Sequence, residues 1–280
     1  MPHLDVPGAS LYYETVGNGP LLLCISGANG SVDIWRMLAG QLKSQFAVAL
    51  WDRRGFSRSY LIGAQDYDQR IETDADDARC LIDHLSKDGT ATVLGNSSGA
   101  IVSLELLCRH PDVIKTLIPH EPPAMKFLPD CDELWRVQKN IYDTYRKSGV
   151  APALMKFADM IKAGAEREGL VSRMDARAGP FVAANVMYWF EREVMVYPFR
   201  RFDVKELEQH KDKLLLANGR DSNKEALQFR ANVVLGHELD LKVNLFAGMH
   251  VGFASHPEEF ARDLVQALRA KNDFYATPGK

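Results

Sequence analysis

The chain has 280 residues, of which 46% are apolar and 25% are charged, and its formal net charge is −3. These values are typical of a soluble globular protein and allow one compact domain with a sizeable insertion. They exclude the strongly basic face that nucleic acid or an anionic membrane would require, so we expect neither as a partner.

The first part of the chain alternates strand and helix patterns. Apolar runs predict buried strands, and apolar residues at helical spacing predict helices. We expect strands at residues 11–16, 20–26, 46–51, 90–94 and 113–119. Helices are expected between them, at residues 33–44, 70–86 and 98–109. This alternation predicts a mostly parallel sheet with helices on both faces.

The alternation stops after the strand at residues 113–119. Only helical patterns follow, at residues 132–147, 151–166 and 183–195. Strands are expected again at residues 213–217 and 241–246, before a last helix at residues 257–270. We therefore divide the chain into a core of residues 1–121 and 208–280 and a helical cap of residues 122–207. Such a cap would cover the carboxyl edge of the sheet, where open α/β sheets bind ligands.

The segment Gly95-Asn96-Ser97-Ser98-Gly99 contains the pattern G-x-S-x-G between a predicted strand and a predicted helix. In that setting the pattern is typical of a nucleophilic serine on a sharp turn. The turn would hold the Ser97 hydroxyl at a helix N-terminus, where backbone N–H groups can stabilise an oxyanion. Ser98 is the adjacent competitor, and we assign its backbone N–H to the oxyanion hole. A plain Gly/Ser turn is the alternative interpretation.

A serine nucleophile needs a base, and in this architecture the histidine follows the last strand. His250 comes after the last predicted strand, in the Gly-containing segment Gly248-Met249-His250. His256 is the nearby alternative, but it precedes Pro257 at a helix start, where a capping role is more natural. We therefore predict that His250 is the general base.

Two carboxylates are candidates for the acid that orients the imidazole. Asp221 lies after the strand at residues 213–217, one residue short of the usual spacing from Gly219. Glu121 lies at the end of the strand at residues 113–119 and is followed by two prolines, which restrict the backbone. We prefer Glu121, and Asp221 stays open as the alternative acid.

The second oxyanion donor is expected in the segment Ser26-Gly27-Ala28, after the strand at residues 20–26. The backbone N–H of Gly27 or of Ala28 would serve, and a plain Gly-rich turn is the alternative. The four cysteines form neither a CxxC pair nor a cluster with histidine at metal spacing, so we expect no metal. The chain start lacks an apolar signal region, and no stretch has membrane-spanning length, so we expect the cytoplasm.

With these residues in place, the chain resembles α/β-hydrolases of the zearalenone lactonase type, fungal enzymes that open a resorcylic macrolactone. The resemblance is strongest in four segments, which are Trp51–Ser59, Gly95–Ala100, His120–Pro122, and Gly248–His250 together with Ser255–Pro257. It implies an eight-stranded, mostly parallel sheet with a helical cap inserted after the sixth strand. It also implies a triad of Ser97, Glu121 and His250, with an oxyanion hole at the backbone of Gly27 and Ser98.

The resemblance implies hydrolysis of a small hydrophobic ester or lactone, such as a zearalenone-type macrolactone, and hence a role in mycotoxin detoxification. No cofactor is expected, and a homodimer stays open. A cap tryptophan would contact the substrate, and Trp189 or Trp135 could serve, with Tyr188 beside them. Two alternatives remain, namely a hydrolase of carbon–carbon bonds in diketones, which uses the same triad, and a ligand receptor on the hydrolase scaffold.

Overall fold

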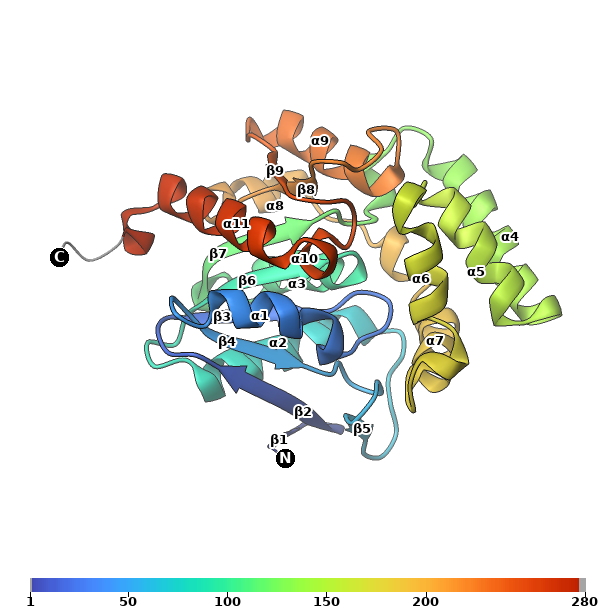
Figure 1. Ribbon diagram of the computed structural model, residues 1–280, viewed down its shortest axis with the longest axis horizontal. Coiled ribbons are helices and arrows are strands. Elements are labelled where there is room, and N and C mark those ends of the chain that lie inside the picture. The colour runs from blue at the N-terminus through green and yellow to red at the C-terminus, as the bar shows by residue number, and fades with distance from the viewer. Residues whose placement is uncertain (1, 277–280) are drawn as a thin grey trace.

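The computed structural model describes residues 2–276 and contains one central sheet (Figure 1). Eight strands follow one another across the sheet in the order β1-β2-β4-β3-β6-β7-β8-β9, and β5 pairs with β2 outside this path. From β4 to β9 all neighbours are parallel, whereas β2 is antiparallel to β1, β4 and β5. The strands are β1 (His3–Val6), β2 (Ala9–Val16), β3 (Leu21–Ile25), β4 (Ala47–Trp51), β5 (Tyr60–Leu61), β6 (Ala91–Asn96), β7 (Ile114–His120), β8 (Ala217–Gly219) and β9 (Asn244–Phe246).

Helices cover both faces of the sheet because the central strands are apolar on both sides. In β3, Leu23 packs into one hydrophobic core and the next residue, Cys24, into the other. This is the alternation that the two-residue period of a strand requires. One core contains α2 (Arg70–Leu85), α3 (Ser98–Arg109) and α9 (Leu227–Leu239). The opposite core contains α1 (Arg36–Leu42), α10 (Gly252–Ser255) and α11 (Pro257–Lys271).

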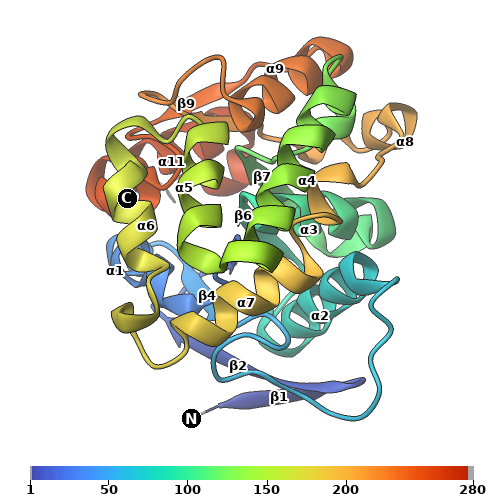
Figure 2. The same ribbon diagram turned by 90° about the vertical axis from the view of Figure 1, so that its right-hand side faces the viewer.

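A group of helices stands between β7 and β8 in the chain and beside the sheet in space, to its right in Figure 1 and facing the viewer in Figure 2. Its helices are α4 (Cys131–Ser148), α5 (Val150–Met160), α6 (Arg167–Arg173) and α7 (Val182–Arg192). They have a hydrophobic core of their own, in which the rings of Tyr145 and Phe190 stack 4.4 Å apart. The following helix, α8 (Val204–Glu208), belongs elsewhere, since Leu207 packs into the core around α3. We call α4 to α7 the cap helices.

Several predicted elements differ from the observed ones. The strand expected at residues 213–217 begins only at Ala217, because residues 211–213 form a 3-10 helix and Leu214 makes a single bridge to Leu117. The helix expected at residues 151–166 ends at Met160, where Lys162 and Gly164 both take positive φ. The strand expected at residues 241–246 is shortened to β9. The sequence did not predict six further strands and α-helices, namely β1, β5, α6, α8, α9 and α10.

In the described part of the chain, no helix combines the length and the apolarity that a membrane span requires. Residues 2–276 also contain no group of three or more His, Cys, Asp or Glu side chains that could hold a metal ion.

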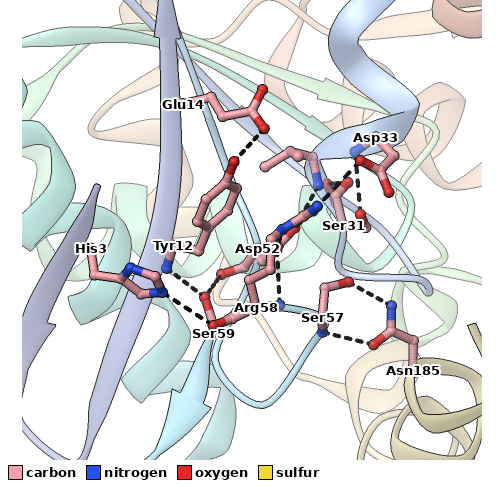
Figure 3. A network of polar contacts seen from close by, with 12 residues as sticks. His3, Tyr12, Glu14, Ser31, Asp33, Asp52, Ser57, Arg58, Ser59 and Asn185 are labelled. Atoms are coloured by element: carbon pink, nitrogen blue, oxygen red, sulfur yellow. Dashed lines mark hydrogen bonds and ion pairs between the residues drawn. The ribbon is translucent and has the colours of Figure 1, made fainter. Parts of the chain in front are cut away.

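A buried carboxylate, Asp52, fixes the loop that follows β4 (Figure 3). Its oxygens accept hydrogen bonds from the backbone N–H of Val32 at 2.8 Å and from the backbone N–H of Arg58 at 3.1 Å. The guanidinium of Arg58 contacts the same carboxylate at 2.6 and 3.0 Å. Asp52 therefore ties the loop after β3 to the loop after β4.

The substitution Asp52→Ala should lower the free energy of unfolding by at least about 2 kcal/mol, because it leaves buried N–H donors without an acceptor. Asp33→Ala is the matched control, since Asp33 is 54% exposed and pairs only with Arg36 and Arg58 at the surface. Its effect should stay within about 1 kcal/mol. Urea denaturation of both variants measures the difference, and equal losses would contradict this assignment.

Candidate active site

Ser97 occupies a sharp turn between β6 and α3. Its φ of +56° and ψ of −126° place a non-glycine residue in a strained region of backbone conformation, as expected of a functional position. Its N–H donates to the carbonyl oxygen of His120 at 3.1 Å, which fixes the turn to the end of β7. Helix α3 begins at the next residue, so the N–H groups of Ser98 and Gly99 lie in its first turn and have no intrahelical acceptor.

Both glycines of the motif are required by close backbone packing. A Cβ on Gly99 would lie 2.2 Å from the carbonyl oxygen of Ile25, and one on Gly95 would lie 2.4 Å from the carbonyl oxygen of Gly99. Because these neighbours are backbone atoms, they cannot move aside as a flexible side chain could. The first turn of α3 therefore lies directly against β3 and β6, and this contact sets the position of Ser97.

Glu121 and His250 meet at the carboxyl edge of the sheet. Oε2 of Glu121 lies 2.7 Å from Nδ1 of His250, and its Oε1 accepts the N–H of Gly219 at 2.9 Å. Glu121 is fully buried and has a φ of +47°, directly after β7. Asp221 is exposed, and the structure pairs Glu121 rather than Asp221 with the imidazole.

The pair perturbs the pKa of both partners. Burial alone would raise the pKa of Glu121, but the hydrogen bond and the positive charge of His250 outweigh it and lower this pKa to about 2. Burial alone would lower the pKa of His250, but the hydrogen bond and charge of Glu121, with a contribution from Glu166, raise it above its usual value. Glu121 is therefore a carboxylate at neutral pH, and it stabilises the protonated imidazole.

Two further contacts hold the backbone beside His250. The side-chain amide of Asn96 donates to the carbonyl oxygen of His250 at 3.0 Å and to Nδ1 of His120 at 3.1 Å. Burial lowers the pKa of His120 to about 4, so this ring is neutral and its Nδ1 can accept. From the cap, the carboxylate of Glu166 accepts the N–H of Val251 at 3.1 and 3.2 Å. Sequence reasoning gave no role to Asn96 or Glu166.

The loop after β3 lies against Ser97. A Cβ on Gly27 would lie 2.8 Å from Cβ of Ser97, so the backbone of Gly27 directly adjoins the serine. Ala28 follows in the same loop and packs against the core of the cap helices. The structure thus places the backbone of Gly27 and of Ser98 beside Ser97, and Ala28 follows one residue further along the loop.

A buried guanidinium, Arg53, connects this loop with the cap. Its Nη2 donates to the carbonyl oxygen of Gly27 at 3.0 Å, and both its Nη atoms contact the carboxylate of Glu193 at 2.7 and 2.8 Å. Nη1 also contacts Asp74 at 2.7 Å, and Tyr197 donates to the same carboxylate at 2.8 Å. Arg53, Asp74 and Glu193 are each at most 1% exposed. Arg53 lies in one of the segments that carry the resemblance, but the pattern alone did not reveal its partners.

A cavity with about 430 Å³ of empty space, its open mouth included, lies between the sheet edge and the cap helices. Ser97, Ser98 and His250 line it from the core, and the remaining wall is largely apolar. The lining residues from the cap and the segments around it are Pro123, Met125, Gln138, Phe157, Met160, Ile161, Trp189, Glu193, Val194, Tyr197, Pro198, Leu227 and Gln228.

Of the three aromatic residues expected to contact substrate, only Trp189 lines this cavity. Tyr188 points elsewhere: its hydroxyl accepts a hydrogen bond from Arg70 at 2.8 Å, and its ring meets Phe56 edge-on at 5.0 Å. Trp135 is 46% exposed, because the buried side of α4 carries Gln138, Ile141 and Tyr145 instead. The expectation for Tyr188 and Trp135 is therefore corrected, since helix phase turns both side chains away.

Known proteins resemble this chain in sequence over most of its length. A sequence model of the family described as alpha/beta hydrolase fold matches residues 20–231. The uncharacterized hydrolase YraK of Bacillus subtilis (strain 168) is 28% identical over 268 residues, or 95% of this chain and 94% of that protein. A zearalenone hydrolase of Bionectria ochroleuca is 26% identical over 273 residues, or 94% of this chain and 95% of that protein. The resemblance predicted from the motifs is thus confirmed.

The solved structure of a thermophilic esterase from Thermogutta terrifontis superposes with a TM-score of 0.73 at 18% identity, and the match covers 97% of this chain and 99% of that one. At this identity the likeness concerns the fold, and it confirms the predicted α/β architecture.

The substitution Gly99→Ala should lower the free energy of unfolding by at least about 2 kcal/mol, because the added methyl group overlaps the carbonyl oxygen of Ile25. Gly40→Ala is the matched control: Gly40 lies in α1 with nothing within 4 Å of its added Cβ. That change should raise stability by about 0.5–1 kcal/mol, since alanine is the better helix former. Urea denaturation distinguishes the two, and a tolerated Gly99→Ala would refute the packing argument.

Proposed function

The chain belongs to the α/β-hydrolase fold family, and from that premise we propose that it hydrolyses the ester bond of a hydrophobic ester or lactone. Ser97 is the nucleophile, His250 the general base and Glu121 the acid of the triad. The observation that carries this proposal is the 2.7 Å contact between Glu121 and His250 beside a cavity that Ser97 also lines. Relatives named hydrolase and zearalenone hydrolase support the same class of reaction.

The first half of the reaction forms an acyl-enzyme. A carboxylate can only accept, so Glu121 requires the His250 proton on Nδ1 and leaves Nε2 as the base. Nε2 takes the proton of the Ser97 hydroxyl as its oxygen attacks the ester carbonyl carbon. The resulting oxyanion is stabilised by the backbone N–H groups of Ser98 and of Gly27 or Ala28. The carbon–oxygen bond of the ester then breaks, and His250 returns the proton to the leaving alkoxide.

The second half uses water in place of the serine. His250 accepts a proton from the water as the water oxygen attacks the acyl carbon. The same N–H groups stabilise the second oxyanion. When the intermediate collapses, Ser97 regains its proton and the acid is released. For a lactone, the alcohol and the acid are two ends of one molecule, so ring opening yields a single hydroxy acid.

The substrate class follows from the cavity wall. Met125, Phe157, Met160 and Trp189 are apolar or aromatic, and such surface favours a hydrophobic body beside the ester. Because two relatives are named zearalenone hydrolase, zearalenone, a macrolactone, is the first natural substrate to test. Hydrolysis of this compound would support the proposed role in mycotoxin detoxification.

Purified protein should open zearalenone and cleave a short-chain p-nitrophenyl ester, and Ser97→Ala should reduce both rates by about 10⁴-fold or more. Product formation followed by chromatography and by absorbance measures the two reactions. Cleavage of the p-nitrophenyl ester alone would keep the triad and discard the macrolactone. Tight binding of zearalenone without turnover of either compound would favour the receptor alternative and contradict the proposal.

The pH profile should identify the acid. Hydrolysis requires neutral His250, so kcat/KM should fall as pH drops through the raised pKa of this ring. Glu121→Gln removes the charge that contributes most to raising this pKa, while burial, which lowers it, and the smaller contribution of Glu166 remain. The acidic limb should therefore move to lower pH and kcat should fall by about 10²–10⁴-fold.

Asp221→Asn is the control for this experiment, because Asp221 is exposed. The pH profile of this variant should match that of the wild type. A shift of the acidic limb in Asp221→Asn but not in Glu121→Gln would reverse the assignment of the acid.

A further inference from the structure

Gln138 is a buried polar residue in the wall of the cavity, and its side chain has no hydrogen-bond partner in the part of the chain that the structure describes. It lies on cap helix α4, is 1% exposed and lines the same cavity as Ser97 and His250. Neither its Nε2 nor its Oε1 has a hydrogen-bond partner among residues 2–276. Burying an unpaired amide is unfavourable, and such a group in a folded protein calls for an explanation.

Gln228 supplies a second polar atom, from a helix that does not belong to the cap helices. It lies on α9, is 3% exposed and lines the same cavity. Its Nε2 donates to the carbonyl oxygen of Ile161 at 2.9 Å, which fixes the orientation of the amide because a carbonyl can only accept. Its Oε1 therefore remains an acceptor with a set position, and it has no partner among the described residues.

The charged and phenolic groups of the cavity wall are, in contrast, already paired. Both carboxylate oxygens of Glu193 contact Arg53, and His250 contacts Glu121. The hydroxyl of Tyr197 donates to Asp74. Apart from the Ser97 hydroxyl and Nε2 of His250, which the proposed reaction uses, the hydrogen-bonding capacity left for a ligand is neutral. It consists of the amide of Gln138, the oxygen of Gln228, and the hydroxyl of Ser98, which is buried without a partner among residues 2–276.

We propose that Gln138 and Gln228 form a polar subsite that binds an uncharged hydroxyl or amide group of the substrate, distinct from the ester that Ser97 attacks. A hydroxyl group fits this pair, since it can donate to Oε1 of Gln228 and accept from the amide of Gln138. The substrate class narrows accordingly to neutral, largely apolar esters or lactones that carry such a group. This inference rests on the proposed hydrolase function.

The test compares p-nitrophenyl hexanoate with its ω-hydroxy analogue in wild type and Gln138→Leu. Wild type should prefer the hydroxylated ester in kcat/KM, and Gln138→Leu should reduce that preference by about tenfold. The fold should tolerate the change because Gln138 has no hydrogen-bond partner to lose among residues 2–276. If Gln138→Leu does not fold, Gln138→Met replaces it. Met160→Leu, an apolar change in the same cavity, should leave the preference unaltered.

A binding measurement separates this inference from the proposed function. Isothermal calorimetry of both esters with Ser97→Ala requires no turnover. The subsite is supported if Ser97→Ala binds the hydroxylated ester more tightly than the plain ester and this difference is lost when Gln138→Leu is added. That result stands even if wild type cleaves neither ester and the hydrolase proposal fails. Equal affinities, or no binding of either ester, overturn the subsite, and this holds even if wild type hydrolyses both esters through Ser97.

Discussion

The contact between the first turn of α3 and the carbonyl oxygens of β3 is the constraint on which the rest of the site depends. Because Gly99 lies against Ile25 and Ser26, the chain must leave β6 and enter α3 within one residue. Ser97 takes up that change of direction with a positive φ. Its N–H is bonded to His120, the last residue of β7, so the same turn also sets where Glu121 begins. A packing contact between backbones thus determines the position of Ser97 and of the end of β7, which Glu121 follows.

The cap is connected to the loops around Ser97 and His250 by polar contacts in addition to apolar packing. Glu166 bonds the backbone that follows His250, whereas Asn185 donates to the carbonyl oxygen of Asn29 at 3.1 Å, in the loop that contains Gly27. Through Arg53, Glu193 is linked to the carbonyl oxygen of Gly27 itself. Breaking a buried pair of this kind leaves an uncompensated charge, so the cap is expected to hold one position relative to the loops.

Features determined by local sequence were predicted well, and features determined by distant contacts were not. The strand–turn–helix around Ser97 was predictable because two glycines, a buried strand and an apolar helix are neighbours in the chain. Arg53 and Glu193 are 140 residues apart, and no local pattern links them. The phase of α4 was hidden because Gln138 interrupts its apolar stripe, which left Trp135 as the more conspicuous residue. The strand expected at residues 213–217 lies instead at Ala217–Gly219, because its limits are set by pairing with β7 and β9 rather than by its own apolar run.

Labelling with a fluorophosphonate, followed by peptide mapping in a mass spectrometer, tests the central claim most directly, since this reagent reacts selectively with activated serines. We expect one adduct per chain, located on Ser97, and we expect labelling to be largely lost in His250→Ala. Labelling of Ser98 instead, or equal labelling of Ser97 in the absence of His250, would contradict the assignment of a serine activated by the histidine that Glu121 orients.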